Sequence, residues 1–136
     1  LPNLVSLDLS RNQIGSFSTI LIRNLNNLQY LNLSSNRMKD VEEFTEGSSC
    51  LKILDLSFNH VMRIGKSAFK NLKSLTELHL QGNWLSYIAP EALKYQTNLQ
   101  VLQLNRNYFD DLPLKVFRSV PQLLLVTPAL QRVTFR

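Results

Sequence analysis

One spacing of leucine and asparagine recurs five times along this chain and constrains its fold more than any other feature. The shared pattern is L-x-x-L-x-L-x-x-N-x-L, with isoleucine, methionine, valine or phenylalanine at some of the last positions. Its asparagines are Asn12, Asn36, Asn59, Asn83 and Asn107, so successive steps are 24, 23, 24 and 24 residues. Self-similarity at such a period is typical of a repeat architecture, in which each unit buries its apolar face against its neighbours.

Each repeat predicts one short strand, because the inner leucines alternate with outward polar residues. We expect strands near residues 6–9, 30–33, 53–56, 77–80 and 101–104, stacked into a parallel sheet over a continuous leucine core. An asparagine amide carries both donors and an acceptor, so it can satisfy backbone groups where the chain leaves the sheet. The five repeat asparagines are therefore predicted to form a buried structural ladder: Asn12, Asn36, Asn59, Asn83 and Asn107.

The pattern resembles the leucine-rich repeat, in the 24-residue form of the typical extracellular animal subclass. The segments LDLSRNQI, LNLSSNRM and LDLSFNHV are similar to Toll-like receptor ectodomains and also to other animal surface repeats. The Gly-x-Ile-Pro of the plant receptor form is absent after the asparagine turn. The resemblance implies an α/β solenoid with a parallel sheet on its concave face and coil or short helices on its convex face.

The repeats predict one domain, residues 1–136, with five regular repeats and an irregular sixth at 123–136. Continuing the regular spacing places Pro128 at an inner strand position, where a proline removes a ladder donor. A second register, Leu130-x-x-Val133-x-Phe135, favours a strand at 132–135 instead. Neither end shows a polar or cysteine-rich cap, so we expect the chain to be a piece of a longer solenoid.

The second repeat is one residue short, and Phe44 is displaced from the position that Phe69 holds one unit later. Its outer segment, residues 40–47, is acidic, whereas the next outer segment carries Arg63, Lys66, Lys70 and Lys73. Stacking predicts that these acidic and basic stretches lie side by side. They form either a solvated charged edge, which stabilises little, or an edge on which a partner docks.

Chemical motifs argue against an enzyme. The four glycines are isolated, so no phosphate-binding loop is present, and no nucleophile elbow occurs. Two histidines and the single Cys50 are too few for a credible metal site, so we expect no metal and no cofactor. Cys50 is expected to be a buried or half-buried structural thiol. No stretch approaches the ~18 apolar residues of a membrane helix, so no membrane insertion is expected in this segment.

The outward residues of the predicted strands and of the turns that follow them form columns from repeat to repeat. These columns mix aromatic, charged and amide groups, as a recognition surface does, although scattered exposed apolar residues are also ordinary. The ligand-binding candidates are Tyr30, Ile53, Phe58, Glu77, His79, Val101 and Arg106. Asp55 and His79 share one column on successive strands, so their side chains can touch. They form either a pH-sensitive ion pair across the sheet or an exposed, inert pair.

The resemblance implies a ligand-recognition segment of an extracellular pattern-recognition receptor, in the extracellular space or the endosomal lumen. It implies a protein or microbial ligand, and dimerisation of the full-length receptor. A net charge of +5 makes nucleic acid a weaker alternative ligand. Asn32-Leu33-Ser34 is a glycosylation sequon, so Asn32 would carry a glycan in a secreted chain. The alternatives are an extracellular matrix or adhesion protein and an intracellular scaffold.

Overall fold

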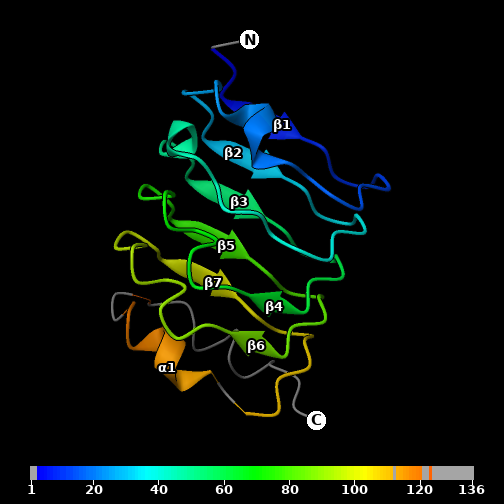
Figure 1. The fold of residues 1–136 in the computed structure, drawn as a ribbon, viewed down its shortest axis with the longest axis vertical. Helices are drawn as coiled ribbons and strands as arrows, with labels where there is room; N and C mark the ends of the chain where they lie inside the picture. Colours follow the sequence, from blue (N-terminus) through cyan, green and yellow to red (C-terminus); the bar gives the residue numbers. More distant parts are fainter. Residues whose placement is uncertain (1–2, 112, 121–122, 124–136) are drawn as a thin grey trace.

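The computed structural model describes residues 3–111, 113–120 and 123. These residues form the predicted solenoid, whose parallel strands stack from one end of the molecule to the other (Figure 1). The five-stranded sheet has the order β1-β2-β3-β5-β7. Its strands are β1 (Ser6–Asp8), β2 (Tyr30–Asn32), β3 (Ile53–Asp55), β5 (Glu77–His79) and β7 (Val101–Gln103).

The register of the sheet aligns equivalent residues of every repeat. Leu7, Leu31, Leu54, Leu78 and Leu102 are paired in sequence from strand to strand. Each regular strand ends one residue before the next inner leucine, but the backbone ladder continues past it. The Leu9 N–H, for example, donates to the Asn32 carbonyl at 2.8 Å. The leucines point inward because side chains alternate between the two faces of a strand.

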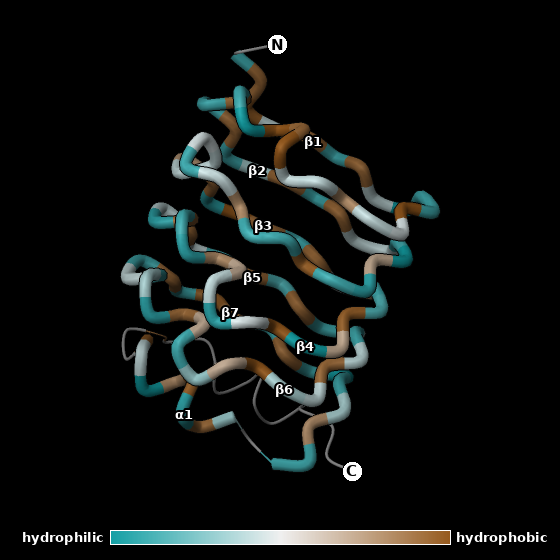
Figure 2. Tube along the Cα trace, viewed as in Figure 1, coloured by the Kyte–Doolittle hydropathy of each residue, from teal (hydrophilic) through white to brown (hydrophobic). Residues whose placement is uncertain are grey.

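The outer layer of the solenoid consists of short, varied elements. It contains the 3₁₀ turns η1 (Thr19–Ile22) and η2 (Glu46–Ser48), and the single helical turn α1 (Leu114–Phe117). The two-residue strands β4 (Arg63–Ile64) and β6 (Tyr87–Ile88) pair in parallel on this side. Hydrophobic and hydrophilic segments alternate along the tube, because an inner leucine stands between outward residues in each strand of the large sheet, and many of the bends at the sides are hydrophilic (Figure 2).

Two phenylalanines fill the outer part of the core in the second and third repeats. Phe44 and Phe69 are both fully buried, although Phe44 comes from the shorter repeat. Buried backbone beside them is satisfied by side-chain amides: Asn71 Nδ2 donates to the Phe44 carbonyl at 2.7 Å, and Gln96 Nε2 to the Phe69 carbonyl at 2.6 Å. The one-residue deletion therefore shifts the phenylalanine along the chain without leaving the core empty.

The acidic and basic outer segments are neighbours, as the stacking argument predicts. Lys70 Nζ lies 3.7 Å from Glu43 Oε1, and both side chains are about half exposed. The expectation of a buried or half-buried Cys50 is wrong, because Cys50 is exposed. It occupies the position before the first core leucine, where Asn27, Ser74 and Asn98 stand in other repeats. The strand predicted at 132–135, and the irregular repeat apart from Leu123, lie outside the described residues.

Candidate ligand-binding surface

A ladder of asparagine amides holds the turns on which the candidate surface stands. Asn36, Asn59, Asn83 and Asn107 are all buried. Each Oδ1 accepts a backbone N–H from the preceding repeat; for Asn59 the donor is Met38, at 3.0 Å. Each Nδ2 donates to an inner-leucine carbonyl of its own turn and to the equivalent carbonyl of the preceding turn. The amides thus tie successive turns together at fixed separation.

Asn12 departs from the expected buried ladder. It is exposed, and its Nδ2 donates only within its own turn, to the carbonyls of Leu9 and Ser10. The physical reason is its place in the stack. The other four asparagines each lie against a preceding turn, whereas no earlier turn is present among the described residues to receive Asn12.

The residue before each ladder asparagine adopts a left-handed backbone conformation. Its φ lies between 55° and 71° in all five repeats, at Arg11, Ser35, Phe58, Gly82 and Arg106. A non-glycine residue is uncommon in this region. The repeated geometry turns the chain off the sheet, and it leaves Phe58 and Arg106 exposed at the sheet edge.

Four candidate residues form one column across the concave face. The register pairs Tyr30 with Ile53, Ile53 with Glu77, and Glu77 with Val101. All four are partly exposed, so each presents part of its side chain to solvent while its strand stays anchored by buried leucines. Hydrogen-bonded strands lie about 4.8 Å apart, so a ligand can touch several of these residues at once. We call Tyr30, Ile53, Glu77 and Val101 the concave column.

The ring of Phe58 packs against Gly82 of the next repeat. A Cβ built on Gly82 would clash with the Phe58 ring, so the ring occupies the space that a larger residue would fill. Phe58 nevertheless remains 46% exposed. Arg106 stands one repeat beyond Gly82 in the same series, two turns from Phe58. The structure therefore seats an exposed aromatic ring in a defined place at the sheet edge.

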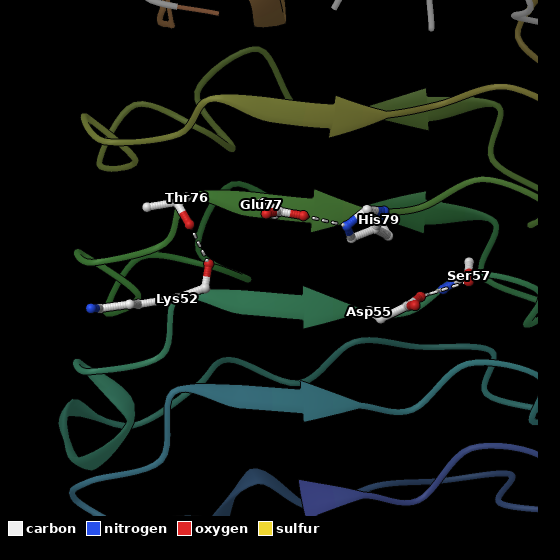
Figure 3. A network of polar contacts seen from close by, with 6 residues as sticks. All are labelled: Lys52, Asp55, Ser57, Thr76, Glu77 and His79. Atoms are coloured by element: carbon white, nitrogen blue, oxygen red, sulfur yellow. Dashed lines mark hydrogen bonds and ion pairs between the residues drawn. The ribbon is translucent and has the colours of Figure 1, made fainter. Parts of the chain in front are cut away.

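Asp55 and His79 form no ion pair with each other, although the two residues are aligned in the register. His79 Nε2 lies 3.1 Å from Glu77 Oε1, on the same strand and the same face (Figure 3). Asp55 Oδ1 instead accepts from the Ser57 N–H at 2.9 Å and from the Ser57 hydroxyl at 2.6 Å. Two donors in its own turn hold the Asp55 carboxylate, and Glu77 is left as the partner of His79.

The same local turn recurs in the first two repeats. Asp8 Oδ1 accepts from the Ser10 N–H, and Asn32 Oδ1 accepts from the Ser34 N–H, both at 2.9 Å. Hydrogen bonds from the Ser10 side chain and backbone lower the pKa of Asp8 below its ordinary value. Asn32 is partly exposed on the concave side of β2. Its side-chain oxygen orders the turn, which leaves the amide nitrogen as the atom to which a glycan would attach.

Sequence reasoning missed an aromatic row beside the ladder, at the position directly after each asparagine. The rings of His60 and Trp84 are stacked, with centroids 4.2 Å apart and planes 9° from parallel. Tyr108 follows in the next repeat and is 40% exposed. Their N–H groups donate to carbonyls of the preceding turns, at 2.8 to 2.9 Å. We call His60, Trp84 and Tyr108 the turn edge; reading the column after the asparagines would have found it.

A second aromatic contact lies on the outer side of the same repeats. The Arg63 guanidinium carbon is 4.4 Å from the centroid of the Tyr87 ring, across the β4–β6 pair. Met62 and Tyr87 are both exposed there. Exposed aromatic, arginine and methionine side chains are enriched where proteins bind partners. The outer β4–β6 pair therefore extends the candidate surface beyond the residues that the sequence pattern predicted.

No group of three or more histidine, cysteine, aspartate or glutamate side chains is placed to hold a metal ion in the part of the chain that the structure describes. Within that part, none of the helical segments has the length and apolarity needed to cross a bilayer.

Comparison with known proteins gives several relatives that carry the same repeat. The chain is 35% identical to Podocan-like protein 1 of Mus musculus over 77% of its length, and 37% identical to the oligodendrocyte-myelin glycoprotein of Homo sapiens over 77%. It is 30% identical to Toll-like receptor 9 of Sus scrofa over 98%. The chain spans only 19%, 23% and 14% of these three relatives, respectively.

A solved structure, the TLR13-ssRNA13 complex, superposes on 90% of this chain with a TM-score of 0.71 and 26% identity, and the match spans 21% of that chain. The family model described as leucine rich repeat matches residues 1–46 and 49–109. Both the sequence period and the stacked parallel strands agree with that match. The chain belongs to the leucine-rich repeat family.

Proposed function

We propose that this chain is a non-enzymatic ligand-recognition segment of an extracellular pattern-recognition receptor of the Toll-like kind. It acts in the extracellular space or the endosomal lumen as part of a receptor ectodomain. The leucine-rich repeat family consists generally of binding proteins, which fits a role without catalysis. Fold alone does not dictate function, so the proposal depends on the surface the repeats present.

The observation that carries the proposal is the concave column with Phe58 beside it. Ladder asparagines and buried leucines hold the frame, so the outward side chains are not needed by the core. Tyr30 and Phe58 offer large rigid contact areas, and Arg106 offers a planar fork of donors for a carboxylate or phosphate. Glu77 and His79 add a polar centre in which the two side chains contact each other. This mixture is suited to recognition of a protein or microbial ligand.

The length of one sequence match favours a receptor over other kinds of leucine-rich repeat protein. The Toll-like receptor 9 match runs along 98% of the chain, whereas the Podocan-like protein 1 match runs along 77%. On this proposal, the full-length protein dimerises and Asn32 carries a glycan. Nucleic acid is a second ligand class, and the TLR13-ssRNA13 neighbour and the basic charge are what favour it.

The alternative in another class is an extracellular matrix or adhesion protein, which the Podocan-like and myelin glycoprotein relatives favour. An intracellular scaffold is the third. The full-length transcript distinguishes them: a cytoplasmic signalling domain after a membrane span supports the receptor, and a secreted protein without one contradicts it. A glycan on Asn32, seen by mass spectrometry of the cell-expressed protein, would exclude the scaffold.

Photo-crosslinking tests the surface. A photoreactive phenylalanine analogue at position 58 of the full-length protein should crosslink to a bound ligand, because Phe58 is an exposed ring beside the concave column. The same analogue at position 66 is the matched control, since Lys66 is exposed on the outer side. Crosslinking only from position 66 would contradict the concave surface.

A further inference from the structure

A polar hollow of about 280 Å³ lies on the outer side of the solenoid, away from the concave column. It is built from two stretches that are far apart in the sequence and adjacent in the stack, one following β4 and one following β6. Its lining residues are Lys66, Ser67, Lys70, Glu91, Lys94 and Tyr95. The hollow therefore combines three ammonium groups with two hydroxyl groups.

The lining carries a net positive charge of two, from three lysines and one glutamate. Lys70 already has a partner, since its Nζ is 3.7 Å from Glu43 of the preceding turn. Lys66 and Lys94 form no ion pair with any residue that the structure describes. Lys94 Nζ instead lies 5.2 Å from the centroid of the Tyr95 ring, which holds the ammonium beside the hollow. Two cations there are thus available to an anion.

The cations also continue along the solenoid. Lys70, Lys94 and Arg118 each stand eleven residues after a ladder asparagine, at 59, 83 and 107. Equivalent positions stack from repeat to repeat, so these three form a row along the solenoid axis. A row of cations of this kind matches a linear ligand whose anionic groups repeat along its length.

We propose that this hollow binds a sulfate group of a sulfated polysaccharide, with the chain of the sugar running along the row of cations. Lys66 and Lys94 would meet the sulfate oxygens, and the hydroxyls of Ser67 and Tyr95 would hydrogen-bond to sulfate or sugar oxygens. Single-stranded nucleic acid is disfavoured, because it needs open aromatic faces on which bases stack, and the Tyr95 ring is already approached by Lys94. This site is separate from the surface in the proposed function and does not depend on it.

The test measures binding of the full-length protein to immobilised heparin, a heavily sulfated polysaccharide, at about 0.15 M ionic strength. The site variant is Lys66→Gln with Lys94→Gln. The control is Lys39→Gln with Lys52→Gln, which removes the same charge from two other exposed lysines. Because a hydrogen bond to a charged group is lost at each site, the site variant should bind at least about tenfold more weakly. The control should bind like the unmodified protein.

Three further measurements sharpen the result. Lys66→Arg with Lys94→Arg, which keeps the charge, should retain most of the binding. Unfolding temperatures should be unchanged in all variants, since exposed substitutions of this kind rarely alter stability. Inorganic sulfate should compete at high concentration, whereas a single-stranded oligonucleotide should compete poorly.

Equal loss in the site and control variants would overturn the proposal, because it would show attraction to net charge alone. Absence of heparin binding by the unmodified protein would overturn it as well. Stronger binding to the oligonucleotide than to heparin, with the same dependence on Lys66 and Lys94, would replace the polysaccharide by nucleic acid and so reject the proposal.

Discussion

Removal of one buried ladder asparagine should destabilise the repeats by an amount that the hydrogen bonds predict. In Asn59→Ala, the Met38 N–H loses its acceptor, which lies 3.0 Å away in the native protein. The carbonyls of Leu33 and Leu56 lose one donor each but keep another, from Asn36 and Asn83 respectively. One buried backbone donor is therefore left wholly unpaired, at a cost of about 1–3 kcal/mol.

Amide hydrogen exchange of the full-length protein is the suitable assay, because a repeat array opens locally and need not unfold in one step. A loss of about 1–3 kcal/mol corresponds to exchange roughly 5- to 150-fold faster at Met38. The neighbouring amides of the second and third repeats should also accelerate.

One control isolates the effect of the ladder. Asn98→Ala removes only an exposed 3.4 Å hydrogen bond to the Lys73 carbonyl, so it should change stability by less than about 0.5 kcal/mol. Equal acceleration in Asn59→Ala and Asn98→Ala would show that the ladder does not hold the turns together.

Three smaller predictions follow from single contacts. Gly82→Ala should cost about 1–2 kcal/mol in urea unfolding, because the residue has φ +71° and its Cβ would meet the Phe58 ring; an unchanged midpoint would contradict this. Ser10→Ala should raise the pKa of Asp8 toward 3.8 in an NMR titration. Since the pKa of Asp8 is lowered in the folded protein, the stability that its ionised carboxylate adds is fully present above about pH 3.8 and is lost as the pH falls through the folded-state pKa. An identical titration midpoint of Asp8 in Ser10→Ala would show that the Ser10 side chain does not lower this pKa. Trp84 is the single tryptophan, so its fluorescence should shift when a ligand covers the turn edge and should not shift on heparin binding.

The spacing of leucine and asparagine was sufficient to predict the solenoid and its parallel sheet. Each inner leucine is buried only when its side chain points into the core of the solenoid, and the repeat period then aligns equivalent residues on neighbouring strands. Phe44 shows that the core tolerates a shift: the sequence marked it as displaced, and the structure buries it fully. Burial of the core apolar residues is therefore predictable from the repeat, whereas the exposure of Cys50, which stands outside the core positions, is not.

Individual polar contacts were harder to predict, because several partners compete for each group. Asp55 and His79 are aligned as expected, yet each bonds within its own strand or turn. The stack of His60 on Trp84 lies in a column that the core pattern does not constrain, and only the folded turns bring the rings together. Asn12 differs from its four equivalents because no earlier turn precedes it among the described residues, and the pattern of a single repeat contains no information on such neighbours.

Ligand recognition is expected on the concave column and the sheet edge beside it. The most direct measurement compares the ligand affinity of the full-length protein carrying Tyr30→Ala and Phe58→Ala with that of Lys66→Glu and Lys70→Glu. Loss of two central aromatic contacts should weaken binding of the recognised ligand by more than about tenfold, since buried aromatic anchors typically cost over 1 kcal/mol each on truncation. The outer-side pair should leave that affinity within about threefold. Unchanged affinity in the first variant, together with lost binding in the second, would contradict the claim and assign recognition to the outer charged edge.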